Sequence, residues 1–403
     1  MSTIPSMRQR VQSIDVLRGI VMVVMALDHT RDYFHKVVNN AGGALALDPT
    51  NMETTTPILF FTRWITHFCA PIFVFLAGTS AYLMSRKKTI PELRAFMIKR
   101  GIWLVIVEVV IITFAWTFNP FYNIIILQVI WAIGISMILL GLVISLPVNT
   151  IIAIGAIIIL GHNLLDIPSI ADSLKGHFIS DLVFDAEFAY YNLTPTHGIM
   201  VAYAFLPWTG LMLLGYGFGQ LYQPGYDPVK RQRLLIKLGA AICLFFIVLR
   251  LINIYGDPHP WSVQPRGNIY TFLSFLNLNK YPPSLLYCCM TIGPCMIALS
   301  LLEKYGNKFT HFFNQFGRVP MFYYIAHIYL LHLIGMIIFF IQGYGSKDIM
   351  TPGNPFLFHP PDFGFSLFYV YVIWIGIILM LYPLCKRYNA YKSTHHQWWL
   401  SYF

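Results

Sequence analysis

Residues 13–36 read SIDVLRGIVMVVMALDHTRDYFHK and govern how we interpret the rest of the chain. The apolar run 20–27 is followed, still at membrane depth, by the ionisable residues Asp28, His29, Arg31, Asp32 and His35. On a continuous helix, positions 28, 32 and 35 share one face. Ionisable side chains in hydrocarbon are costly and normally face a cavity, a partner or a site. We therefore predict a functional site here, and the alternative is a helix that has reached the outer membrane interface.

The composition is that of a membrane protein. The chain has 403 residues, of which 57% are hydrophobic and 11% are charged, whereas soluble domains carry roughly 25% charged residues. The net charge of +10 resides in Lys and Arg between the apolar segments, which is the positive-inside pattern rather than a nucleic-acid footprint. The six cysteines lie in apolar segments without zinc-site spacing, so no metal is expected.

Ten apolar segments approach the length that crosses a bilayer. They predict an all-α fold, a polytopic helical membrane bundle of about ten transmembrane helices, at residues 14–37, 57–84, 96–117, 121–146, 148–163, 199–222, 233–255, 282–302, 319–342 and 364–385. The Lys- and Arg-rich loops lie on the same side as both ends of the chain, so both termini are predicted to be cytoplasmic.

We treat residues 1–403 as a single transmembrane domain with two long extracytoplasmic loop regions, 163–198 and 256–281. Prolines in these regions break regular structure, as expected outside the hydrocarbon. We expect the two regions to cover an extracytoplasmic cavity.

The second apolar segment brings further candidates to the depth of His29. His29 lies roughly 22 Å from the cytoplasmic end of its helix, and His67 lies roughly 15 Å from the outer end of the next one. In a hydrocarbon core about 30 Å thick, the two imidazoles fall within about two helical turns of each other. Arg63 stands one turn above His67. Histidine, tuned by a nearby carboxylate, is suited to acid–base catalysis, and a hydrogen-bonded core histidine is the alternative.

A third candidate group lies in RVPMFYYIAHIYLLH, residues 318–332. Tyr323 and His327 are one turn apart on the same helix face. Both follow Arg318, which marks the cytoplasmic start of the segment, so a cofactor arriving from the cytoplasm would meet them there. Interfacial packing of Tyr and His is the alternative. The sequence has no Walker A, GxSxG or HExxH motif.

The stretch RVQSIDVLRGIVMVVMALDHTRDYF (10–34) resembles the N-terminal signature of heparan-alpha-glucosaminide N-acetyltransferase-like membrane proteins, most closely their short bacterial members. Later blocks of that family are resembled by WITHFCAPIFVFLAGTS (64–80), NKYPPSLLY (279–287), FGRVPMFYYIAHIYLLH (316–332) and the terminal YPLCKRYNAYKSTHHQWWLSYF. The wider group resembles the transmembrane acyltransferase superfamily. This resemblance implies a bundle of ten or eleven helices and acyl transfer from cytoplasmic acyl-CoA to a sugar amine or hydroxyl across the membrane.

The resemblance also implies roles for individual residues. The family's catalytic histidine follows the DxxRG block, which makes His29 our first choice and His35 our second. Asp28 or Asp32 would orient the base, and Arg63, His67 or Tyr323 would donate to the thioester oxygen. The expected contacts to coenzyme A are Arg18, Tyr323, His327, Arg318, Arg86, Lys87 and Arg100. Direct transfer and an acyl-histidine intermediate both remain open.

We therefore expect an acyl-CoA-dependent O- or N-acyltransferase that uses acetyl-CoA or another short acyl-CoA and an extracytoplasmic saccharide acceptor. The large luminal domain of the lysosomal enzymes has no counterpart in the sequence, so a glycosaminoglycan acceptor is not expected. The expected location is the bacterial cytoplasmic (inner) membrane, with no nucleic-acid partner and with a homodimer left open. The alternatives are a proton-coupled transporter or exporter that relays protons through intramembrane Asp and His, and a non-catalytic assembly factor.

Overall fold

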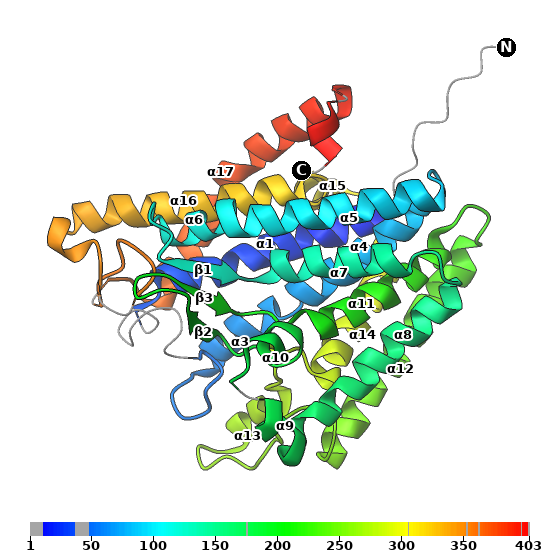
Figure 1. The fold of residues 1–403 in the computed structure, drawn as a ribbon, viewed down its shortest axis with the longest axis horizontal. Helices are drawn as coiled ribbons and strands as arrows, with labels where there is room; N and C mark the ends of the chain where they lie inside the picture. The colour runs from blue at the N-terminus through cyan, green and yellow to red at the C-terminus, as the bar shows by residue number, and fades with distance from the viewer. Residues whose placement is uncertain are drawn as a thin grey trace.

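Helices make up most of this computed structural model, which describes residues 11–36, 48–174, 176–304, 306–351, 354–361, 363–395 and 397–401 (Figure 1). The longer helices are α1 (Gln12–Phe34), α3 (Pro57–Thr66), α4 (Cys69–Ser85), α5 (Ile90–Ile106), α7 (Val129–Val143), α8 (Val148–Gly161), α11 (Phe205–Phe218), α12 (Pro228–Ile252), α14 (Leu285–Leu302), α15 (Lys308–Gly317), α16 (Pro320–Ile341) and α17 (Leu367–Thr394). The shorter ones are α6 (Thr113–Thr117), α9 (Pro168–Leu174), α10 (Phe178–Val183) and α13 (Asn268–Leu276). A π-helix, η1 (Val107–Ile112), joins α5 to α6, and 3₁₀ turns follow α8 (η2, His162–Asp166) and α11 (η3, Gly219–Tyr222).

Each of the ten predicted segments contains a helix. Within the described residues, six helical stretches are long and apolar enough to cross a membrane: Pro57–Ser85, Val148–Asp166, Pro228–Ile252, Leu285–Leu302, Pro320–Ile341 and Leu367–Thr394. The mostly helical fold is confirmed, and these helices indicate an integral membrane protein. The predicted number of ten is not reached by this measure. Helix α1 does not meet this measure because it carries five charged residues, and α7 and α11 do not meet it because they are shorter than a membrane span.

A small sheet was not predicted. Strand β1 (Ile124–Leu127) pairs in parallel with β3 (Gly198–Val201), and β2 (Ala189–Asn192) pairs antiparallel with β3. The predicted span 121–146 is therefore a strand followed by α7. The sequence IIIL of β1 is as apolar as that of a membrane-spanning helix, so hydropathy alone does not distinguish a strand from a helix here. The loop region 163–198 likewise contains α9, α10 and β2.

Helix α1 organises the bundle because most of its side chains are buried, and it contacts α3, α4, α14, α15, α16 and α17 (Figure 1). Two glycines fix its first half against α15. A Cβ atom on Gly19 would overlap the carbonyl oxygen of Phe313, and one on Gly317 would overlap that of Asp15. Small residues allow such close approach of helix backbones in membrane proteins. The second half of α1 thereby reaches the polar groups described next.

Candidate functional site

Four charged side chains form a buried ion-pair network where α1 meets α3. One carboxylate oxygen of Asp28 lies 2.9 Å from Nη1 of Arg31, and the other accepts a hydrogen bond from Arg63. Nη2 of Arg31 donates to Asp32 at 2.6 Å. Only 6% of Asp28 and 2% of Arg31 are exposed. The structure thus brings together the predicted residues Asp28, Asp32 and Arg63 and adds Arg31.

His67 lies in the short turn that separates α3 from α4. The end of a helix leaves carbonyl groups without intrahelical partners, and the hydroxyl of Tyr287 on α14 donates to the carbonyl of His67 at 2.7 Å. The His67 ring packs 5.4 Å from the Tyr287 ring. Its Nδ1 is buried without a hydrogen-bond partner in the described part of the chain. Asp28 and Arg63 act electrostatically on both His29 and His67.

The imidazole that contacts His29 belongs to His327 of α16. Nδ1 of His29 lies 2.7 Å from Nε2 of His327, and Nδ1 of His327 lies 2.9 Å from the carbonyl oxygen of Tyr323. A carbonyl only accepts, so Nδ1 of a neutral His327 carries the proton and its Nε2 accepts one from Nδ1 of His29. This leaves the lone pair on Nε2 of His29, which has no hydrogen-bond partner among the described residues.

Aromatic rings enclose this histidine pair. The Trp116 ring meets His29 edge-on at 4.9 Å, and Tyr324 does so at 6.1 Å. The Tyr323 ring stacks on His327 at 5.3 Å, with 13° between the ring planes. The Tyr323 hydroxyl is buried and has no hydrogen-bond partner within the described residues. A buried hydroxyl in this state calls for a water molecule or a ligand group as its partner.

His35 stands apart from this group. It follows the last residue of α1, where Phe34 and Lys36 exchange backbone hydrogen bonds with Phe365 at 2.7 and 3.1 Å. The structure therefore brings His29, and not His35, into the cluster with His327 and Asp28.

Two of the residues predicted to bind coenzyme A, Arg18 and Arg318, lie near the interface between α1 and α15. Arg18 donates to the carbonyl of Leu76 at 2.8 Å and to the hydroxyl of Ser80, which ties α1 to α4. Arg318 follows Gly317, whose backbone meets α1, and the Arg318 side chain is half-buried.

The other three predicted cations lie between Arg18 and Arg318 in the chain. Arg86 and Lys87 are exposed in the turn after α4, and Arg100 lies on α5 with its guanidinium 5.9 Å from the Phe96 ring centre. Among the described residues, no group of three or more His, Cys, Asp or Glu is arranged to hold a metal ion.

Sequence reasoning missed Lys280 and Tyr281, which precede α14. Arg63 donates to the Tyr281 hydroxyl at 3.3 Å, and the Lys280 ammonium lies 4.9 Å from the Tyr281 ring centre. Lys280 is buried, with 8% of its surface exposed. The sequence feature that could have indicated its burial is a lysine followed by Tyr-Pro-Pro at the start of an apolar segment.

Comparison with known proteins gives one family match. Residues 10–248, more than half of the chain, match the family described as heparan-alpha-glucosaminide N-acetyltransferase, catalytic. The match contains Asp28, His29, Arg63 and His67, whereas His327 lies beyond it. No curated protein matches the chain. The family match gives no support to the transporter alternative.

Proposed function

The chain belongs to the heparan-alpha-glucosaminide N-acetyltransferase family, and from this premise we propose that it moves an acetyl or other short acyl group from cytoplasmic acyl-CoA to a sugar amine or hydroxyl on the extracytoplasmic side. We place it in a bacterial cytoplasmic membrane with about ten spans and both termini in the cytoplasm. The distribution of Lys and Arg between the apolar segments supports this orientation.

The His29–His327 contact is the observation that carries the proposal. It leaves Nε2 of His29 as a base, and a neutral imidazole is a suitable general base near neutral pH. The acceptor's nitrogen or oxygen attacks the thioester carbonyl carbon, and its proton passes to Nε2 of His29. The carbon–sulfur bond then breaks, and the coenzyme A thiolate takes up a proton to leave as the thiol.

The charges near His29 suit this chemistry. Asp28 and the cations Arg31, Arg63 and Lys280 act on it. With Asp32, which pairs with Arg31, the group holds three cations and two carboxylates. A net positive surrounding favours the negative charge that develops on the thioester oxygen. We propose the Tyr323 hydroxyl as the donor to that oxygen, because it has no other partner among the described residues, whereas Arg63 already binds Asp28 and Tyr281.

We further propose that the phosphates of coenzyme A meet cytoplasmic cations. Arg18 lies on α1, Arg318 directly follows α15, Arg86 and Lys87 follow α4, and Arg100 lies on α5. Arginine suits the role because its planar guanidinium binds phosphate through two hydrogen bonds.

Purified full-length protein in lipid nanodiscs tests the proposal. The protein should release free coenzyme A from acetyl-CoA slowly, with water as acceptor, and His29→Gln should reduce the rate by at least about 100-fold. His311→Gln removes an exposed histidine of α15 and is the matched control. An undiminished rate in His29→Gln would refute the assignment of His29. Radiolabelled acetyl that stays on the denatured protein would identify an acyl-histidine intermediate, and its absence would favour direct transfer.

A further inference from the structure

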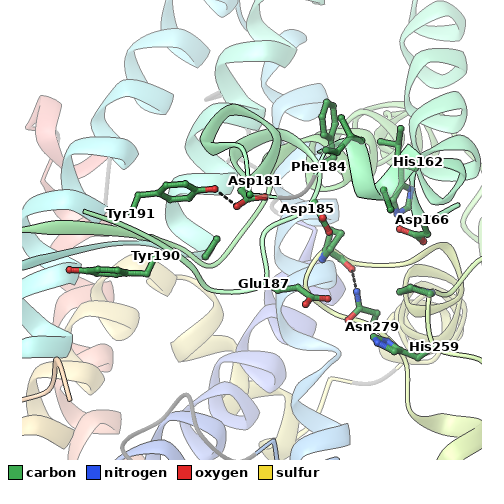
Figure 2. Close-up of a pocket in the computed structure, with 17 residues that line it drawn as sticks. His162, Asp166, Asp181, Phe184, Asp185, Glu187, Tyr190, Tyr191, His259 and Asn279 are labelled. Atoms are coloured by element: carbon green, nitrogen blue, oxygen red, sulfur yellow. Dashed lines mark hydrogen bonds between the residues drawn. The ribbon is translucent and has the colours of Figure 1, made fainter. Parts of the chain in front are cut away.

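A cavity of about 720 Å³ lies between the segments 162–191 and 258–282, the two long loop regions of the predicted outer side (Figure 2). We call it the outer pocket. Its lining includes four carboxylates and two tyrosine rings: Asp166, Asp181, Asp185, Glu187, Tyr190 and Tyr191. Within the described residues, neither Lys nor Arg lines it. Figure 2 shows Glu187 between the two tyrosines on one side and Asn279 with His259 on the other.

The walls of the outer pocket are held in place by buried polar groups. The guanidinium of Arg250, which is 1% exposed, donates to four carbonyl oxygens of the 256–281 region, on His259, Ser274, Phe275 and Asn277. Nε2 of His162 donates to the carbonyl of Pro283 at 2.8 Å and so joins the two walls. A pocket built in this way is largely pre-formed, as ligand sites generally are.

One short segment connects the outer pocket to the buried ion pairs. Asn279 and Pro282 line the pocket, and Tyr281 between them accepts a hydrogen bond from Arg63, the partner of Asp28. The Tyr281 ring also packs 4.8 Å from Phe188, which lies between the lining residues Glu187 and Ala189. A molecule in the outer pocket is therefore separated from the Arg63–Asp28 pair by Tyr281 and Phe188.

Two of the carboxylates that line the outer pocket differ in their hydrogen-bond partners. Burial, the hydrogen bond to Asp181 and the charge of that carboxylate raise the pKa of Tyr191 to about 12, so the phenol stays protonated and donates to Asp181. Glu187 is exposed and forms no hydrogen bond or ion pair with another described residue, so its carboxylate faces the cavity uncompensated. Carboxylates accept hydrogen bonds from sugar hydroxyls and amines, and they repel sulfate, phosphate and other carboxylates.

We propose that the outer pocket binds the acceptor and selects a saccharide unit without negative charge, one that is neutral or carries an amine. The inference rests on the proposed acyl transfer for the identity of the ligand as acceptor. The tyrosine rings supply apolar faces for the sugar ring, and the carboxylates bind its hydroxyls or amine. Sulfated and other anionic glycans are excluded by charge, which sets this acceptor apart from a glycosaminoglycan.

Equilibrium binding without acyl-CoA tests the inference. Full-length protein in nanodiscs of neutral lipid is titrated calorimetrically with a panel of neutral, amine-bearing and O-sulfated disaccharides of matched linkage. We expect neutral or amine-bearing members to bind and their sulfated counterparts to bind at least about tenfold more weakly. The difference should shrink as NaCl rises from about 50 mM to about 500 mM, because salt screens exposed charges.

Glu187→Lys should abolish or reverse this discrimination, while Glu53→Lys should preserve it. Glu53 is an exposed carboxylate of the loop before α3 that does not line the outer pocket. The inference is overturned if no uncharged or amine-bearing member binds, if sulfated members bind equally well, or if Glu187→Lys leaves the preference unchanged. Acetyl-CoA hydrolysis by the unmodified protein is measured separately. Saccharide binding without hydrolysis would refute the proposed function alone, and hydrolysis without saccharide binding would refute the pocket assignment alone.

Discussion

Nδ1 of His29 lies 2.7 Å from Nε2 of His327, although 298 positions of sequence separate the two residues. The Tyr323 carbonyl accepts a hydrogen bond, so Nδ1 of a neutral His327 carries the proton. Nε2 of His327 is then an acceptor, so Nδ1 of His29 carries the proton that joins the two rings. In metal sites, the partner that fixes the tautomer of a ligand histidine contributes about 10- to 100-fold to metal affinity or activity, and we expect an effect of this size here. The role proposed for His29 thus depends on an acceptor supplied by α16.

The first prediction concerns that acceptor. His327→Phe keeps a ring but removes the acceptor, and it should reduce the rate of acetyl-CoA hydrolysis by about 10- to 100-fold. His327→Gln keeps a side-chain carbonyl that accepts from Nδ1 of His29, and it should retain more of the rate. Initial rates are compared at saturating acetyl-CoA, with thermal unfolding as the control for folding. Equal rates in His327→Phe and the unmodified protein would contradict the positioning role.

The second prediction concerns the buried pair Asp28–Arg63. Removing one member of a buried ion pair leaves an uncompensated charge and typically costs about 3–5 kcal/mol. Arg31 still contacts Asp28 when Arg63 is removed, so Arg63→Met should destabilise the protein by no more than the lower end of this range. The double variant Asp28→Asn/Arg63→Met should lose less than the sum of the two single variants. The measurement is unfolding of the detergent-solubilised protein. Strict additivity would show that the two side chains do not interact.

The sequence predicted the helices and the candidates on α1 because both follow from patterns within one segment. Charges after an apolar run mark α1, and the matching depth of α3 suggested that Arg63 lies near Asp28. The His29–His327 contact was not predictable in this way, since helical spacing identifies neighbours only within a helix. Lys280 was missed for a related reason. Lys280 contacts the ring of its neighbour Tyr281, and packing adds the ring of Tyr203 from a separate segment.

The third prediction concerns the glycine contact that positions α1. A methyl group on Gly19 would overlap the Phe313 carbonyl, which belongs to the backbone and has little freedom to move. Gly19→Ala should therefore destabilise the protein by about 1–3 kcal/mol, the usual cost of overpacking. Gly161→Ala is the matched control, because a Cβ there has no neighbour within 4 Å. Similar unfolding temperatures for the two variants would show that α1 shifts to accommodate the methyl group.

The last prediction concerns pH and His359, in the segment between α16 and α17. His359 is 4% exposed, and burial lowers its pKa from 6.5 to about 4, while its Nδ1 donates to the Leu357 carbonyl at 2.8 Å. The folded state thus favours the neutral ring, so the unfolded state binds more protons below pH 6.5. The stability that His359 contributes is complete above pH 6.5 and is lost as the pH falls towards 4, by about 2 kcal/mol at pH 5.

His359→Asn tests this dependence, because the asparagine amide donates to the same carbonyl and does not titrate. Unfolding temperatures are measured in detergent at about pH 7.5 and about pH 5. The unmodified protein should lose more stability between the two values than His359→Asn does. The other buried histidines are present in both proteins, so only the difference between the two losses of stability reports on His359. Equal losses in the two proteins would show that the folded state does not lower the pKa of His359.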